Sequence, residues 1–383
     1  MNFVNRNIDT LLVESKSSST RWKTERDVRY FEQYLREIKC VDLPMIKIPE
    51  NELIDHMSVF FSGIKKKKDG SDYEPTSLWS MYASLKRHLK EQQYNFSNNQ
   101  TAPAALSKVT DVLKAACREL KKSGLGNKPH KSDAVTANEI QNLFESGIAG
   151  LHNPLALNNA MLINMMFLGF RGAKECYQRQ LGDIKLVTVD GTRYLTVVKE
   201  RITKTRNGEV PKDASLGVPR LAELGTISCP VKAYECLLRE RPDKFKGDET
   251  PLFLRPSTTD PYQRNIPSGK WFYNSRVGIN HLTKMTQKMF GLSDVDTTGR
   301  HITNTSCRKS VATTMLTNNH TQKAIMRQMR HTNPNSVLNY DESTGEMTQA
   351  VTKNLFGNTK REVAGPSHNI PGAESVKIFN ITF

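Results

Sequence analysis

The chain has 383 residues, of which 37% are apolar, and a formal net charge of +16. This length suffices for two domains that each bury a core. No run approaches the ~18 consecutive apolar residues that a membrane-spanning helix needs, so no membrane partner is expected. The first residues lack the basic-then-apolar pattern of a signal peptide, so we expect an intracellular protein.

Positive charge is spread along the whole chain. Residues 1–130 carry a net +6, and residues 131–383 carry the remaining +10. A polyanion contacted by both halves would fit this distribution, and nucleic acid is the commonest such partner. The alternative, that the charge only keeps the protein soluble, stays open.

The cysteines are scattered, without a CxxC pair and without a histidine cluster nearby. This pattern favours reduced thiols, so we expect neither a disulfide nor a structural zinc site. The cysteines are Cys40, Cys117, Cys176, Cys229, Cys236 and Cys307.

Residues 1–122 are predicted to form a helical domain, with helices over about 20–39, 50–64, 74–93 and 104–122. Apolar residues recur at helical spacing in these segments, and Pro75 stands near the start of the third helix. The KKKK run at 65–68 is expected to be a solvated loop, with nuclear localisation or phosphate contact as the alternatives. The basic face of this domain is expected to include Lys86, Arg87, Lys90, Lys121 and Lys122.

A segment rich in Gly, Pro and Lys, residues 123–134, is typical of a linker. Thr136 and Glu139 then have the spacing of a capping box, so a second domain over 135–357 begins here with a helix. The alternating stretch 182–209 contains the turn dipeptide Asp190-Gly191 and predicts two or three antiparallel strands. Further helices are predicted over about 154–168, 230–239, 278–290, 307–318 and 321–329, with a last one from just after Tyr340 to 355.

The C-terminal tail, residues 358–383, ends in the apolar sequence SVKIFNITF at 375–383. Such an end is expected to pack on a surface, either on a neighbouring subunit or on its own domain.

The sequence lacks the motifs of several enzyme classes. The chain has no GxxxxGK[ST], no GxSxG, no HExxH and no acidic cluster that would clearly bind two metals. A metal-dependent nuclease is therefore disfavoured. Cations and a tyrosine remain, and they can cleave a phosphodiester without metal if they supply a nucleophile, donors for the phosphate charge and an acid for the leaving oxygen. His331, nine residues before Tyr340, can hold the phosphate or accept the tyrosine proton.

Four segments stand in the order found in tyrosine recombinases: GFRGAKE (169–175), ITKTRNG (202–208), TNTSCRKS (303–310) and RHTNPNSVLNY (330–340). The chain resembles most closely the recombinases of Crypton DNA transposons and the host proteins derived from them. The resemblance covers roughly residues 20–357 and implies an α+β architecture. Its parts would be an N-terminal helical (SAM-like) core-binding domain and a mixed α/β catalytic domain with a small antiparallel sheet.

The resemblance also implies a catalytic set. Arg171 and Arg308 match the two arginines that bind the scissile phosphate. Lys204 matches the lysine that acts as general acid, and His331 matches a donor to the phosphate. Tyr340 matches the nucleophile, which forms a 3′-phosphotyrosyl bond and releases a 5′-hydroxyl. Lys199 and Arg206 are the alternatives for the lysine position.

Two positions depart from the family pattern. Thr305 stands where many tyrosine recombinases have a histidine, and threonine cannot act as a base near neutral pH; His301 lies close in sequence and is a candidate to compensate. Lys174 stands where an acidic residue is common, with Glu175 next to it as a candidate support for the active-site arginine. Charge and placement make Lys86, Arg87, Lys309 and Arg206 candidate DNA contacts, to phosphates rather than bases.

The sequence therefore predicts a site-specific recombinase or transposase that cleaves and rejoins double-stranded DNA at the ends and target site of a Crypton-type element. The resemblance implies no metal and no cofactor, assembly as a dimer to tetramer on DNA, and action in the nucleus. Three alternatives stay open: a catalytically weak or inactive domesticated DNA-binding protein, a type IB topoisomerase and a transcriptional interaction module.

Overall fold

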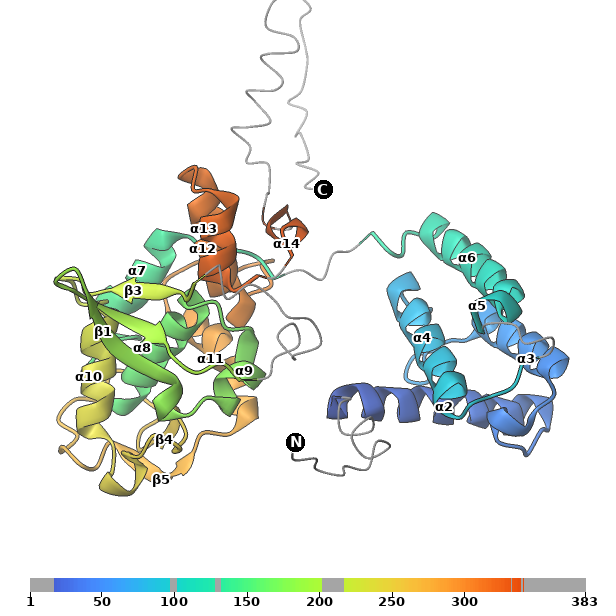
Figure 1. Cartoon of the computed structure of the whole chain (residues 1–383), viewed down its shortest axis with the longest axis horizontal. Helices are drawn as coiled ribbons and strands as arrows, with labels where there is room; N and C mark the ends of the chain where they lie inside the picture. Colours follow the sequence, from blue (N-terminus) through green and yellow to red (C-terminus); the bar gives the residue numbers. More distant parts are fainter. Residues whose placement is uncertain are drawn as a thin grey trace, which may run out of the picture. The chain divides into compact units, whose positions relative to one another are not determined.

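The computed structural model describes residues 17–96, 102–127, 132–201, 217–331, 333–338 and Tyr340. The chain divides into two compact units, Met1–His130 and Lys131–Phe383 (Figure 1). The division falls within the segment 123–134, whose two ends belong to different units. The Gly126 N–H donates to the Glu74 carboxylate at 2.8 Å, whereas the Asp133 N–H donates to the His301 carbonyl at 3.0 Å.

The first unit consists of helices in the part of the chain that the structure describes. The bounds are α2 Ser18–Lys39, α3 Glu50–Gly63, α4 Pro75–Glu91, α5 Ala102–Ala105 and α6 Ser107–Lys122, with a 3₁₀ turn η1 at Met45–Lys47. The Ser17 hydroxyl caps α2 by accepting from the Thr20 N–H at 3.2 Å, and Pro75 opens α4. Helix α4 packs on α2 and α6, and α3 packs on α2 and α6, so the four long helices share one core.

The predicted helix over 104–122 is divided in two. Leu106 leaves helical geometry, with φ −89° and ψ 18°, and its side chain is fully buried. The turn between α5 and α6 thus serves to bring an apolar side chain into the core, which periodicity along a single helix does not reveal.

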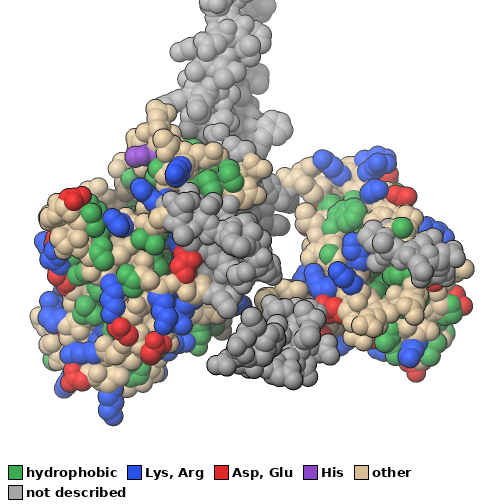
Figure 2. Space-filling view, viewed as in Figure 1, with side chains coloured by type: hydrophobic (Ala, Val, Ile, Leu, Met, Phe, Trp, Pro, Cys, Tyr) green, Lys and Arg blue, Asp and Glu red, His purple; other side chains and the backbone are tan. Residues whose placement is uncertain are grey.

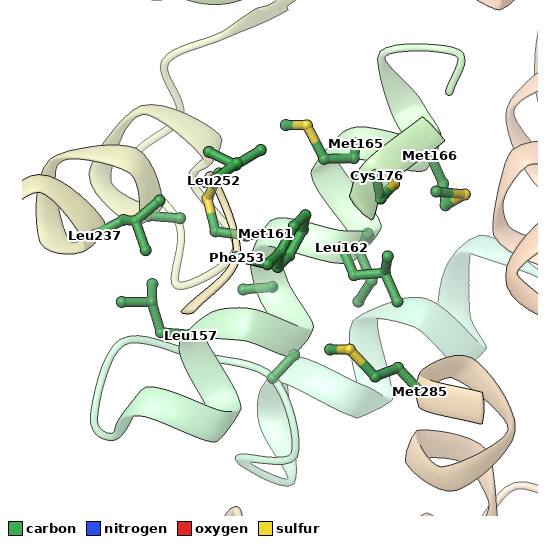
Figure 3. Close-up of a cluster of buried hydrophobic side chains, with 14 of the residues drawn as sticks. Leu157, Met161, Leu162, Met165, Met166, Cys176, Leu237, Leu252, Phe253 and Met285 are labelled. Carbon is green, nitrogen blue, oxygen red and sulfur yellow. The ribbon is translucent and has the colours of Figure 1, made fainter. Parts of the chain in front are cut away.

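The second unit is built around α8, Pro154–Phe167. Almost every residue of this helix is buried, because α9, α10, α11 and α12 all pack against it. Figure 3 shows its Leu and Met side chains meeting Cys176, Leu237, Phe253 and Met285 from the surrounding elements. The other helices are α7 Ala137–Glu145, α9 Gly172–Gln178, α10 Pro230–Glu240, α11 Ile279–Leu292, α12 Asn304–Thr317, α13 Gln322–Met329 and α14 Asn335–Leu338, with 3₁₀ turns η3 Leu181–Asp183 and η5 Asp243–Phe245.

Two small antiparallel sheets complete the second unit. Strands β1 Ile184–Val189, β2 Thr192–Val197 and β3 Arg220–Ala222 form one sheet in that order, and α10 packs on β2 and β3. Asp190 and Gly191 join β1 to β2 with φ values of 50° and 76°, as a type I′ hairpin turn requires. Strands β4 Leu254–Pro256 and β5 Phe272–Arg276 form the second sheet.

The predicted α+β class, a helical N-terminal part followed by a mixed part with a small antiparallel sheet, is confirmed. Two of the two or three strands predicted within 182–209 are β1 and β2, and the third strand of the sheet, β3, lies at 220–222, after a segment, 202–216, outside the described residues. The predictions for the helix after Tyr340 and for residues 358–383, including 375–383, also lie outside them. No described helix is long and apolar enough to cross a membrane.

Candidate active site

Arg308 lies on the second turn of α12, and only 2% of its surface is exposed. Its guanidinium donates to the carbonyls of Gly169 and Met329, so it joins the chain after α8 to the end of α13. The prediction that α12 begins at residue 307 was wrong by three residues. Thr303 and Ser306 form a capping box, and the Asn304 amide donates to the Leu282 carbonyl at 2.8 Å, so helix geometry starts at Asn304.

Gly169 allows the chain after α8 to approach the end of α13 closely. Its φ is +80°, and a Cβ added there would lie 2.6 Å from the Gln328 carbonyl oxygen. Residues with a side chain rarely adopt this φ, and ordinary van der Waals contacts between carbon and oxygen are longer than this. Residues 169–171 and 329–331 therefore run beside each other, with the Arg308 side chain holding both.

Arg171, two residues after Gly169, is the N-cap of α9. Its backbone N–H donates to the Glu175 carboxylate at 2.8 Å, and the Glu175 side chain is buried. Glu175 therefore fixes the backbone from which the Arg171 side chain extends. The positive charge of Arg171 lowers the pKa of both Arg308 and His331, so its guanidinium lies within electrostatic range of both.

His331 is 2% exposed, and its backbone N–H donates to the Met326 carbonyl at 2.9 Å. Burial, together with the positive charges of Arg308 and Arg171, lowers the pKa of its imidazole to about 4. The ring is therefore neutral at pH 7. Within the described part of the chain its buried Nδ1 has no hydrogen-bond partner, which is uncommon for a buried polar atom and leaves this nitrogen able to bond to a bound group.

Tyr340 stacks on His331, with 5.5 Å between ring centroids and 20° between ring planes. The chain makes this contact by ending α13 at Met329, turning through Arg330 in left-handed geometry, and forming the short helix α14. The Tyr340 N–H donates to the Val337 carbonyl at 3.0 Å. Val337 is itself buried in the small core that α12 and α13 share.

The electrostatic balance of this site is positive. Burial lowers the pKa of Arg308, a hydrogen bond to the Tyr340 hydroxyl opposes that shift, and Arg171 adds to it. Among the described residues no carboxylate forms an ion pair with Arg171 or Arg308. Two guanidiniums and a neutral imidazole beside a hydroxyl can bind a tetrahedral oxyanion and place it against that hydroxyl.

The other residues predicted for the catalytic site are either exposed or lie outside the described part of the chain. Lys204 and Arg206 lie outside the described residues. Lys199, the alternative to Lys204, is exposed and forms an ion pair with Glu249 at 3.3 Å. Thr305 is exposed, and its backbone N–H donates to the Thr303 hydroxyl at 3.2 Å.

His301, the candidate to compensate for Thr305, is exposed, and its backbone N–H donates to the Asp133 carboxylate at 2.6 Å. Lys174 is exposed on α9. Neither observation assigns these two side chains a role in the anion site.

Lys and Arg side chains lie at several places on the visible face of each unit (Figure 2). Lys86 lies over the Tyr82 ring, with 5.9 Å from its ammonium to the ring centroid. Arg87 donates to the Thr24 hydroxyl at 2.6 Å and so also joins α4 to α2. Lys309 is only 6% exposed, so its predicted contact with DNA stays a prediction that its burial does not favour.

Sequence reasoning missed the residues that surround Phe170, the neighbour of Arg171. Two guanidiniums, those of Arg179 and Arg330, lie over the Phe170 ring. One local signal existed, since arginine at the left-handed position after a helix replaces the usual Gly or Asn.

No protein-family model matches the chain. The chain is 24% identical over 253 residues to the uncharacterized protein KIAA1958 of Homo sapiens, a match that covers 63% of this chain and 32% of that protein. It is 25% identical over 209 residues to zinc finger MYM-type protein 3 of Homo sapiens, covering 50% of this chain and 14% of the relative. The chain thus spans about a third of the length of the KIAA1958 protein, and less of the other.

Among solved structures, the chain is similar to the Tn1549 transposon integrase in complex with transposon right end DNA, with a TM-score of 0.43, 14% identity and coverage of 89% of this chain and 94% of that one. It is also similar to the XerH site-specific recombinase bound to difH substrate, with a TM-score of 0.41, 13% identity and coverage of 84% and 75%. For the XerA recombinase the TM-score is 0.35, with 15% identity and coverage of 91% and 95%. These structural neighbours are recombinases and an integrase.

Proposed function

We propose that this chain is a tyrosine recombinase that cleaves and rejoins double-stranded DNA through a 3′-phosphotyrosyl bond on Tyr340, and that it mobilises a Crypton-type element in the nucleus. One observation carries the proposal. Tyr340 stacks on His331 and bonds to Arg308, and Arg171 lies within electrostatic range of both. Side chains from three segments far apart in sequence therefore lie close together, which supports a common site for the scissile phosphate.

In the first step, Arg171 and Arg308 donate to the non-bridging oxygens of the scissile phosphate and stabilise the charge that builds on them. The Tyr340 oxygen attacks phosphorus, and the bond to the 5′ oxygen breaks. The departing 5′ oxygen takes a proton from Lys204, and the phenolic proton passes to water. Arg308, which bonds to the Tyr340 hydroxyl, stabilises the phenolate as it forms.

His331 serves as a donor in this scheme rather than as the base. A group with a pKa of about 4 takes up a proton poorly at neutral pH. A neutral imidazole that carries its proton on the nitrogen facing the phosphate can donate to it. The unpartnered Nδ1 is available for this, within the residues described.

In the second step, the 5′-hydroxyl of another strand attacks the phosphotyrosine and restores a phosphodiester. The covalent bond retains the energy of the original linkage, so no nucleotide and no metal are consumed. Exchange between two duplexes needs several protomers, and we propose a dimer to tetramer on DNA in which residues 375–383 contact a neighbouring subunit.

A catalytically weak, domesticated DNA-binding protein is the second candidate. Thr305 favours it, because an exposed threonine there supplies no base or acid near neutral pH. A type IB topoisomerase would share the chemistry but would relax supercoils without preference for a site. The first experiment below separates these candidates.

The test uses nicked duplexes, both randomised and taken from the DNA that flanks the gene, incubated with the full chain in EDTA. The expected result is a covalent protein–DNA band on a denaturing gel, absent for Tyr340→Phe and retained for Tyr273→Phe, an exposed tyrosine of β5. Tight duplex binding without a band would favour the domesticated protein. A band together with relaxation of any supercoiled plasmid would favour the topoisomerase.

A further inference from the structure

Two arginine side chains lie over the Phe170 ring. The guanidinium carbon of Arg179 lies 4.6 Å from the ring centroid, and that of Arg330 lies 4.7 Å from it. All three side chains are buried, and Arg330 is 4% exposed. Burial lowers the pKa of Arg179, and the charge of Arg330 lowers it further, so the two cations repel each other.

Acidic groups offset this repulsion from outside the stack. Arg330 donates to the Glu200 carboxylate at 3.0 Å, and Arg179 lies 3.8 Å from the Asp183 carboxylate. Asp183 also accepts from Arg201 at 2.5 Å. The network therefore ties the stack to residues 200–201, which follow β2 and precede the segment 202–208.

The stack has a specific place relative to the anion site. Phe170 is the residue before Arg171, and Arg330 is the residue before His331. One residue further back, Arg308 joins the carbonyls of Gly169 and Met329. The two chain segments are thus connected twice: Arg308 joins Gly169 to Met329, and Arg330 stacks on Phe170. Arg171 and His331 are the next residues in the two segments.

Arg330 itself adopts left-handed geometry, with φ 54° and ψ 41°, as the C-cap of α13. Glycine is the residue that favours this geometry. If Arg330 only ended the helix, glycine would serve at least as well. Its long, charged, buried side chain therefore has a function besides ending the helix.

We propose that Arg330 is a positioning residue that, by stacking on Phe170 and pairing with Glu200, sets the His331 ring against Tyr340 and Arg171. This inference rests on the proposed function. Arg330 does not touch the phosphate in this scheme, and it acts through His331.

The test replaces Arg330 by glycine in the full chain, because glycine suits the backbone and leaves the helix end intact. The rate of covalent complex formation on the nicked duplex is expected to fall about 10- to 100-fold, since a misplacement near 1 Å costs roughly that much. Duplex affinity is expected to stay within about twofold. Arg330→Lys, which keeps the charge but loses the planar group, is expected to restore little of the rate.

A matched control is available in the first unit. Cys40 is also a C-cap in left-handed geometry, with φ 53° and ψ 30°, and it is exposed. Cys40→Gly makes the same backbone change in the other unit and is expected to leave the rate unchanged.

A double-mutant cycle decides whether Arg330 acts through His331. In a His331→Ala background, Arg330→Gly is expected to have no further effect on the rate. Independent, multiplicative losses would overturn the inference, as would a full rate for Arg330→Gly alone.

The inference stays testable if the wild-type chain forms no covalent complex, which would count against the proposed function. NMR of the His331 ring is then the measurement. Loss of the stack is expected to open the site and raise the His331 pKa from about 4 toward 6.5. A pKa that does not move in Arg330→Gly would overturn the positioning role by itself.

Discussion

Replacing Gly169 by alanine is expected to destabilise the second unit by about 2–5 kcal/mol. The left-handed φ of +80° costs a side chain roughly 1–2 kcal/mol. The added Cβ would lie 2.6 Å from the Gln328 oxygen and 2.9 Å from the Met329 carbonyl carbon, and forcing such an atom into packed structure costs about 1–3 kcal/mol more. Both contacts are backbone, so neither can rotate away.

Gly172→Ala is the matched control, because Gly172 also has a positive φ, +60°, but its added Cβ would meet nothing within 4 Å. It is expected to cost only the conformational part, about 1–2 kcal/mol. The loss of chain freedom in the unfolded state is common to both variants and cancels in the comparison. The difference, about 1–3 kcal/mol, measures the close approach of the two segments.

Urea unfolding measured by tryptophan fluorescence supplies the assay. Trp271 is buried in the second unit, whereas Trp22 and Trp79 belong to the first and are exposed, so replacing both by Phe leaves Trp271 as the reporter. Equal destabilisation by the two alanine variants would refute the argument that Gly169 is needed for contact with Gln328 and Met329. The Gly169 variant is also expected to lose covalent complex formation while the Gly172 variant retains more of it.

Three further predictions follow from the site and its surroundings. The pKa of His331 in the folded state, about 4, lies below its value of 6.5 in the unfolded state, so the free energy of unfolding should fall as the pH drops from 6.5 to 4. In urea titrations at several pH values, His331→Gln should reduce this dependence of the unfolding free energy on pH. If Lys86 contacts a phosphate, Lys86→Ala should reduce the slope of log binding constant against log salt concentration for duplex DNA by about 0.9. The ammonium of Lys108 is paired with Asp55, so Lys108→Ala should leave this slope unchanged. Tyr234→Phe removes a hydroxyl that donates to the Ile184 carbonyl at 2.6 Å and should cost about 1–2 kcal/mol in thermal unfolding without altering duplex binding.

Local signals in the sequence predicted much of the fold. The capping pair Thr136 and Glu139 begins α7, and Asp190-Gly191 turns between β1 and β2 as expected. In both cases the residues that determine the conformation are neighbours in sequence. Helix α12 combines both cases, because the local capping box of Thr303 and Ser306 begins it, whereas its first residue Asn304 bonds to the Leu282 carbonyl, 22 residues away.

The site was predictable only in part, for the same reason. Motif order identified Arg171, Arg308, His331 and Tyr340 as candidates, and the structure brings them together. The stack of Arg179, Phe170 and Arg330 could not be found that way. Its members come from α9, from the chain after α8 and from the end of α13, and no spacing in the sequence indicates that they meet.

Arg308 has a consequence for how related chains are compared. Its guanidinium holds two backbone carbonyls, so its loss would disturb the fold whether or not DNA is cleaved. Under the proposed function, a relative that no longer cleaves DNA would still be under pressure to keep this arginine. Tyr340 is only half-buried and fixes no distant segment through its hydroxyl in the described structure other than its bond to Arg308. A relative that has lost the activity should therefore be expected to lose the tyrosine before it loses the arginine.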